Sequence, residues 1–241
     1  MRDPAAYAGA LPVADFLVWT STALAPHGFR SSTSLPLVSV CRDELMFSFV
    51  DAVTAEWGHC FDMSSLAGLP LLGRTGVTAA LGHAPDSGGR HRLVVFAFPH
   101  IGLDADGTVG AVHRPGVPGT TAACGAVDVA RTALRRGVSG VVLDPHDVEE
   151  SVLVARLHGV LGDAPVPGLV EVTELVRAAA VEELTLLLTG LSTDRVRVDV
   201  ALLSGFVVHG ATDDVVSASS ATVWVDGTRR DLALPSWAEL N

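Results

Sequence analysis

Three side chains that can bind a metal ion lie at the ends of predicted strands and helices. Cys41 directly follows a short apolar run at Leu35–Val40, and His100 follows a second run at Leu93–Phe98 after one proline. Because reactive groups gather at the carboxyl ends of parallel strands, we expect these two residues to lie together. Cys124 is one residue inside a predicted helix, where backbone N–H groups favour a thiolate. Two thiolates and a neutral imidazole form a three-ligand zinc site with room for a fourth partner.

A structural role for the cysteines is the alternative. The wide spacing of Cys41, His100 and Cys124 matches no CxxC-type zinc pattern. Free cysteine is also common in protein cores, where it packs as a small apolar residue. Cys60, next to His59, follows no strand end, and we interpret it as a packing residue.

Asp43 is the carboxylate nearest to these residues in sequence. It stands two positions after Cys41, so it can reach a metal held by Cys41 or a water bound to that metal. It also begins a helical pattern at Asp43–Trp57, and an Asp at this position is a favourable N-cap. The two roles are compatible.

Apolar periodicity predicts alternating strands and helices. This order is typical of an α/β fold, with a central, mostly parallel sheet flanked by helices. We expect a single domain over residues 1–241, in which residues 1–34 form an N-terminal helical extension. The predicted strands are Leu35–Val40, Leu93–Phe98, Val138–Leu143, Val196–His209 and Thr222–Val225, and the predicted helices are Ala5–Ala10, Asp15–Leu24, Asp43–Trp57, Thr78–His83, Ala123–Gly137, Val148–Leu161 and Val172–Leu188.

Composition excludes several classes of function. The 241 residues carry 27 acidic and 16 basic side chains, a net charge of −11, which disfavours nucleic-acid and anionic-membrane surfaces. All the basic residues are Arg, so chemistry that needs a lysine Schiff base or a P-loop lysine is excluded. No apolar run reaches the ~18–20 residues of a membrane span. Three cysteines are too few for a disulfide scaffold, and we expect a cytoplasmic protein.

Six blocks of sequence, taken in order, resemble the limiting-CO2-inducible protein B/C family, a group of β-type carbonic anhydrases. Together they lie within residues 35–137, and six ordered blocks are far more specific than any one of them. The blocks are LVSVCRDE (Leu37–Glu44), FDMSSLAGLPLLGRTG (Phe61–Gly76), GHAPDSGGR (Gly82–Arg90), FPHIGLDADGTVG (Phe98–Gly110), RPG (Arg114–Gly116) and ACGA (Ala123–Ala126).

The resemblance implies a β-carbonic-anhydrase-like fold that works as a homodimer. It implies zinc held by Cys41, His100 and Cys124, with Asp43 as the neighbouring catalytic carboxylate. The implied reaction is the reversible hydration of CO2 to bicarbonate by a zinc-bound hydroxide. The low fraction of charged residues, 18%, is consistent with surface buried between subunits.

One departure from ordinary β-carbonic anhydrases concerns the partner of Asp43. Those enzymes carry Cys-x-Asp-x-Arg, whose Arg pairs with the Asp, whereas here the Arg position is Leu45. Arg42, Arg74 and Arg114 are the candidate replacements. Loss of the Arg is the basis of an alternative function, a catalytically silent zinc-fold homologue that acts in binding or inorganic-carbon sensing.

A cysteine hydrolase is a further alternative. Cys124 at a helix N-terminus would be its nucleophile and His100 its base. The sequence has no nucleophile-elbow motif to support it.

Overall fold

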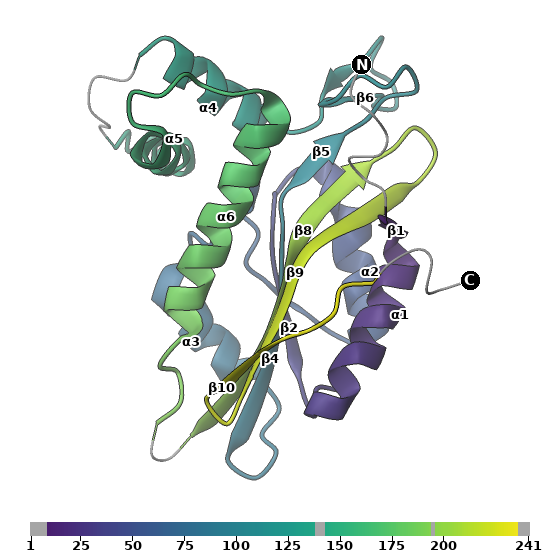
Figure 1. The fold of residues 1–241 in the computed structure, drawn as a ribbon, viewed down its shortest axis with the longest axis vertical. Coiled ribbons are helices and arrows are strands. Elements are labelled where there is room, and N and C mark those ends of the chain that lie inside the picture. Colours follow the sequence, from purple (N-terminus) through teal and green to yellow (C-terminus); the bar gives the residue numbers. More distant parts are fainter. Residues whose placement is uncertain (1–8, 138–142, 194–195, 236–241) are drawn as a thin grey trace.

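A computed structural model describes residues 9–137, 143–193 and 196–235, and its centre is a twisted sheet (Figure 1). In these ranges the sheet has eight strands, in the order β1-β9-β8-β4-β2-β3, with β10 beside β9 and β5 beside β8. The strands are β1 (Leu11–Pro12), β2 (Leu35–Val40), β3 (Phe61–Asp62), β4 (Arg90–Phe98), β5 (His100–Gly102), β8 (Arg197–His209), β9 (Asp214–Val225) and β10 (Thr228–Asp231).

The prediction of a mostly parallel sheet is confirmed, although the sheet is mixed rather than purely parallel. Strands β2, β3, β4, β5 and β8 pair in parallel, whereas β9 is antiparallel to β1, β8 and β10. The sequence pattern at Thr222–Val225 marks only the end of β9. A short turn between His209 and Asp214 joins β8 to β9, and a connection this short forces the two strands to be antiparallel.

Helices cover both faces of the sheet. Figure 1 shows α1 (Val13–Leu24) and α2 (Phe47–Trp57) on one side and α3 (Gly73–His83) and α6 (Leu169–Leu188) on the other. Alternate residues of β4 face the two layers: Phe96 and its neighbours pack with α1 and α2, while Val95 and its neighbours pack with α3 and α6. A strand covered on both faces is apolar throughout, which explains its unbroken hydrophobic sequence.

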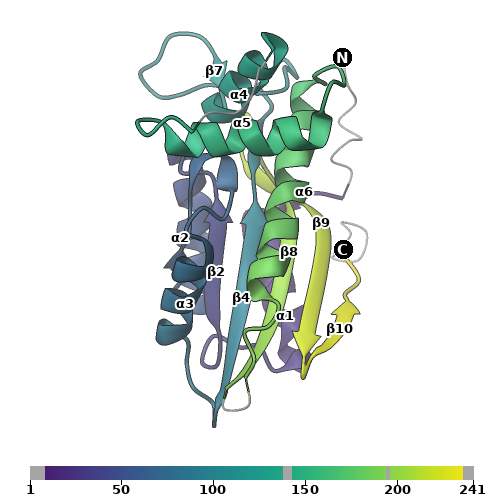
Figure 2. The ribbon, with the colours of Figure 1, turned by 90° about the vertical axis from the view of Figure 1, so that its left-hand side faces the viewer.

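Two further helices lie beyond the end of the sheet at which β4 finishes. These are α4 (Gly125–Arg135) and α5 (Val148–Leu161), seen above the sheet in Figure 2. A separate two-stranded hairpin, β6 (Ala111–Val112) and β7 (Thr121–Ala122), lies near the same end. Short 3-10 helices η2 (Ala25–His27), η3 (Glu44–Met46) and η4 (Leu66–Gly68) complete the described elements.

Most predicted elements are present, with different ends. The strand at Leu35–Val40 and the helix at Val148–Leu161 have the predicted bounds. The helix predicted at Asp43–Trp57 is split into η3 and α2, and α3 and α6 begin earlier than predicted. The helix predicted at Ala5–Ala10 and the strand predicted at Val138–Leu143 fall largely outside the described residues. Among the helices in the described ranges, none combines the length and the apolar character needed to span a bilayer.

Glu150, in the first turn of α5, is a carboxyl group with an unpaired buried oxygen. Its Oε1 has no hydrogen-bond partner within the described ranges. Burial, reinforced by the charge of Asp147, raises the pKa of Glu150 from 4.5 to about 7. The folded protein therefore keeps a proton that the unfolded chain releases, so this group lowers stability as pH rises from 4.5 to 7.

We expect Glu150→Gln to stabilise the protein only at neutral and alkaline pH. Urea unfolding at pH 8 should show a gain of about 1–2 kcal/mol in the free energy of unfolding, because the uncharged amide removes the cost of ionisation. At pH 4 the variant and the wild type should be equally stable. Glu182→Gln, at an exposed position of α6, is the control. An equal gain in the free energy of unfolding at both pH values would show that ionisation of Glu150 is not the cause.

Candidate metal centre

Cys41 stands at the carboxyl end of β2, where loop contacts fix its backbone. It forms an isolated parallel bridge with Ser65, whose N–H donates a hydrogen bond of 3.1 Å to the carbonyl of Val40. Gly68, with φ of +85°, lies against the same stretch, where a Cβ would be 3.2 Å from the Val40 carbonyl carbon. Glycine adopts this φ without strain and permits the close approach.

His100 begins β5, which follows β4 after a one-residue interruption at Pro99. Proline has no N–H to donate to a neighbouring strand. Its carbonyl instead accepts a hydrogen bond of 3.1 Å from the N–H of Val207, and His100 pairs with the same residue of β8. The side chain of His100 is only 1% exposed, so its polar atoms need partners inside the protein.

Cys124 is the N-cap residue of α4 and lies just before the helix, which begins at Gly125, two positions later than predicted. The chain reaches the sheet here because Gly102 has no side chain. A Cβ at Gly102 would lie 2.5 Å from the Ala111 carbonyl oxygen and 2.8 Å from the Cβ of Ala123. A glycine at this point therefore lets the segment that carries Cys124 approach β5.

The structure brings the three predicted ligands together. The sulfur atoms of Cys41 and Cys124 are 3.9 Å apart, and these sulfurs and a ring nitrogen of His100 all lie within 4.8 Å of one another. Two thiolates about 2.3 Å from a tetrahedral zinc ion would be roughly 3.8 Å apart. The cluster could therefore hold one small metal ion. Within the described residues it is the one such group of three, and Cys60 lies outside it.

The ring nitrogens of His100 have different surroundings. Nδ1 lies 3.1 Å from Nε2 of His209. Nε2 is buried and, in the part of the chain that the structure describes, has no hydrogen-bond partner. An unpartnered buried imidazole nitrogen is costly unless something binds it. Nε2 therefore fits the role of a metal ligand.

The contact between the two sulfurs shifts their pKa values in opposite directions. The contact with Cys124 lowers the pKa of Cys41 to about 4, against the effect of burial, and His100 adds to the lowering. The same contact, together with burial, raises the pKa of Cys124 well above its ordinary value. The contact therefore disfavours deprotonation of both sulfurs at once, so the metal-free pair retains one proton. Because metal ligation needs both sulfurs deprotonated, binding an ion would release this proton.

The family of proteins described as limiting CO2-inducible proteins B/C beta carbonic anhydrases matches residues 10–225. The chain belongs to this family. The chain is similar to limiting CO2-inducible protein LCIB, with which it shares 26% sequence identity. The two structures superpose with a TM-score of 0.78, and the match covers 94% of this chain and 95% of LCIB. A homologue, PtLCIB4, is 23% identical, with a TM-score of 0.80 over 94% and 96% of the two chains, and shows the shared fold. No curated protein sequence matches the chain.

In this member of the limiting CO2-inducible B/C family, Arg114 is the partner of Asp43. Its Nη2 donates to both carboxylate oxygens, at 3.1 and 3.2 Å, and both side chains are less than one-fifth exposed. Arg114 lies between β6 and β7, so the hairpin supplies the guanidinium that the Leu45 position lacks. The other acceptors of Arg114 are Glu44 Oε1, Thr121 Oγ1 and the carbonyls of Ala122 and Ala123.

Asp43 has the capping role that the sequence predicts, and it lies near the sulfur cluster. One of its oxygens, Oδ1, accepts a hydrogen bond of 3.1 Å from the N–H of Leu45 and caps η3. Burial raises the pKa of Asp43, while the Leu45 amide lowers it. The guanidinium of Arg114 also favours the carboxylate form. The backbone N–H of Asp43 in turn helps to lower the pKa of Cys41, so this residue adjoins the sulfur cluster.

Two residues on the Nδ1 side of His100, His209 and Asp214, were not among the site residues predicted from the sequence. His209 ends β8, a strand that pairs in parallel with β4 and β5, and its side chain is 3% exposed. The rule that selected Cys41 and His100, a reactive residue at the carboxyl end of a strand, also selects His209. Asp214 begins the antiparallel strand β9, which that rule does not cover.

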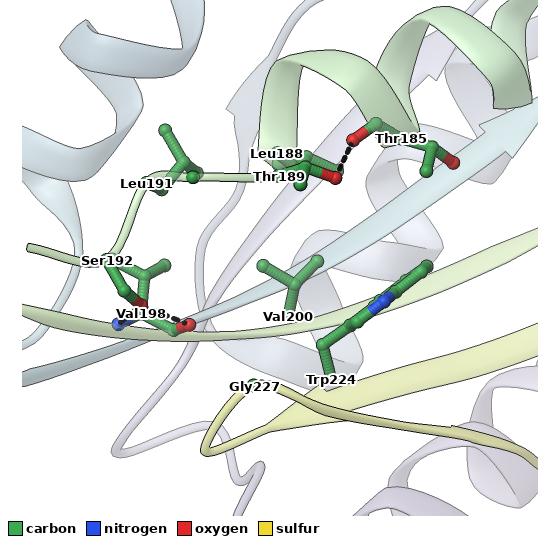
Figure 3. A pocket seen from close by; sticks show the side chains of 10 residues that line it. Thr185, Leu188, Thr189, Leu191, Ser192, Val198, Val200, Trp224 and Gly227 are labelled. Atoms are coloured by element: carbon green, nitrogen blue, oxygen red, sulfur yellow. Dashed lines mark hydrogen bonds between the residues drawn. The ribbon is translucent and has the colours of Figure 1, made fainter.

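A cavity of about 190 Å³ lies away from this centre, between the end of α6 and strands β8 and β9 (Figure 3). Val200 and Trp224 form part of its apolar lining. The hydroxyls of Thr185, Thr189 and Ser192 are each hydrogen-bonded to the backbone. None of the predicted site residues lines this cavity, so it is separate from the candidate metal centre.

Proposed function

We propose that the protein is a zinc-dependent carbonic anhydrase that catalyses the reversible hydration of CO2 to bicarbonate. The observation that carries the proposal is the buried group of Cys41, His100 and Cys124, with the Asp43–Arg114 pair beside it. Two sulfurs and one imidazole suit zinc, and three protein ligands leave a position open for substrate chemistry. Membership of a family of β-type carbonic anhydrases supports the same reaction.

Zinc, when bound, would act as a Lewis acid that makes water nucleophilic near neutral pH. The chain's part in the reaction is to orient that nucleophile. Asp43 is acceptor-only when ionised, so it can hold a water or hydroxide by its proton and direct a lone pair towards CO2. Its carboxylate is held in place by the N–H of Leu45 and by the guanidinium of Arg114.

Arg114 has a second consequence, because it would hold Asp43 away from a bound metal. A carboxylate free to move could occupy the open ligand position and prevent turnover. The bidentate contact from Nη2, in a guanidinium with several further acceptors, opposes that movement. The silent-homologue alternative was based on the missing Arg at Leu45, and Arg114 supports an active enzyme instead.

The cysteine-hydrolase alternative has less support. Its nucleophile would be the thiolate of Cys124, yet contact with Cys41 and burial raise the pKa of Cys124 well above its ordinary value. A thiol that stays protonated is a weak nucleophile. The base, His100, would also need to face Cys124 alone, whereas it lies with both sulfurs.

We also propose that the enzyme is a cytoplasmic homodimer. The resemblance to β-type carbonic anhydrases implies the dimer, and exposed apolar side chains are consistent with it, since Phe47 is 60% and Leu186 72% exposed. Sedimentation equilibrium would measure the mass directly. A species of 25.0 kDa, the mass of one chain, at all concentrations would refute the dimer.

One experiment tests the reaction. The purified chain is analysed for zinc, and CO2 hydration is followed by stopped-flow pH change. We expect about one zinc per chain and hydration well above the uncatalysed rate. Zinc at this ratio without turnover would support the silent alternative, and absence of zinc binding would remove the basis of both.

A further inference from the structure

His209 lies directly behind His100, away from the sulfur cluster. Its Nε2 is 3.1 Å from Nδ1 of His100, and the two rings meet edge to face at 78° with centroids 5.1 Å apart. Both side chains are almost fully buried. Burial in this arrangement leaves the Nδ1 of His100 with one partner, and the direction of that hydrogen bond decides which nitrogen of His100 carries the proton.

Asp214 determines that direction. Its Oδ1 lies 3.0 Å from Nδ1 of His209, and the two residues are cross-strand neighbours in the β8–β9 hairpin. Its other oxygen, Oδ2, accepts a hydrogen bond of 3.2 Å from the hydroxyl of Ser48 in α2. A carboxylate only accepts hydrogen bonds, so Nδ1 of a neutral His209 carries the proton and Nε2 accepts.

The tautomer of His209 in turn determines the tautomer of His100. Because Nε2 of His209 accepts, Nδ1 of His100 must donate, and Nε2 of His100 keeps its lone pair. That nitrogen is the buried atom without a hydrogen-bond partner within the described residues. Free histidine in water prefers the opposite tautomer, with the proton on Nε2, so the chain of contacts changes which nitrogen can bind a metal.

We propose that His209 and Asp214 are positioning residues that hold His100 in the tautomer and orientation required to bind the metal through Nε2. The proposal rests on the metal site proposed above. Loss of a residue that hydrogen-bonds to a metal-binding histidine typically weakens metal binding by about 10–100-fold. Neither residue needs to touch the ion or the substrate, because both act through His100.

Zinc affinity, measured by competition with a chromogenic chelator, tests the energetic part. His209→Leu removes the acceptor and should weaken zinc binding by about 10–100-fold. His209→Gln keeps an oxygen that can accept from Nδ1 of His100 and should restore most of the affinity. His91→Gln, in β4 and outside the cluster, is the matched control. Unchanged affinity in His209→Leu, or equal losses in the Leu and Gln variants, would overturn the proposal.

The tautomer itself is observed by nitrogen-15 NMR of the histidine rings in metal-free protein. We expect the proton on Nδ1 of His100 in the wild type and in His209→Gln, and its transfer to Nε2 in His209→Leu. A proton on Nε2 in the wild type would overturn the proposal. This measurement is independent of turnover, so an Nδ1 proton in a chain that fails to bind zinc would refute only the proposed function.

Discussion

Cys41→Ser and Cys124→Ser are each expected to abolish zinc binding and to reduce CO2 hydration to the uncatalysed rate. Each change replaces a thiolate with a hydroxyl that stays protonated at neutral pH and is a poor zinc ligand. Loss of a residue that only hydrogen-bonds to a ligand is expected to weaken zinc binding by about 10–100-fold. The loss in these variants should be larger, because a direct bond to the metal is removed. Metal analysis and stopped-flow hydration measure the two effects.

Cys60→Ser is the matched control for these variants. Cys60 is half-buried and contacts Thr54 Oγ1 through its sulfur, so its replacement also removes a thiol from the interior. It lies outside the metal cluster and should leave zinc content and hydration unchanged. Zinc at the wild-type ratio in Cys41→Ser, or loss of zinc in Cys60→Ser, would contradict the proposed ligand set.

Chelation should reproduce the ligand variants in the wild type. An ion bound only by the folded chain stabilises it by about 2.7 kcal/mol when present at 100 times its dissociation constant. We expect a chelator to lower the unfolding midpoint of the wild type and to have no effect on Cys41→Ser. A wild-type midpoint that does not respond to the chelator would show that no metal contributes to stability.

The positions of Cys41 and His100 could be predicted because the signal is local. A short, unbroken apolar run identifies a strand buried on both faces, and β2 and β4 are such strands. The side chain that follows each run is then placed at the carboxyl edge of the sheet. Cys124 was identified from the predicted start of a helix instead. In the structure it is the N-cap residue of that helix, α4.

The contacts that complete the site depend on tertiary structure. Arg114 and Asp43 are 71 positions apart in sequence, and nothing around Arg114 distinguishes it from the exposed Arg42 next to Asp43. The contact exists because the β6–β7 hairpin is held near β5, where Gly102 leaves room for Ala111. Such a close approach between loops leaves no periodic pattern in the sequence.

The antiparallel part of the sheet escaped prediction for a different physical reason. β9 has twelve residues, but among its first seven only Val216 is buried, so only its apolar end resembled a strand. The pairing of His209 with Asp214 follows from the turn between β8 and β9. A strand pattern alone does not determine such pairing, because the register depends on the residues of the turn.

Asp43→Asn is expected to separate metal binding from catalysis. The variant should keep about one zinc per chain, because the three ligands are unchanged. Its kcat/KM for CO2 hydration should fall by about 10²–10⁴-fold, because an amide can present a donor where the nucleophile needs an acceptor. Loss of zinc in this variant would instead make Asp43 a structural part of the metal site.

Arg114→Leu tests the same pair from the other side. Without the guanidinium, Asp43 loses its ion pair and can move towards the metal, so we expect zinc to be retained and kcat/KM to fall by about 10²-fold or more. Arg114→Lys should recover only part of the activity, because one ammonium cannot reproduce the planar contacts with Asp43 and Glu44. Arg42→Leu is the control. Arg42 precedes Asp43 in sequence and forms an exposed ion pair with Glu149, so this variant should keep most of the activity. If both leucine variants lost activity equally, a general change in charge near the site would explain the effect, and Arg114 would have no specific role in holding Asp43.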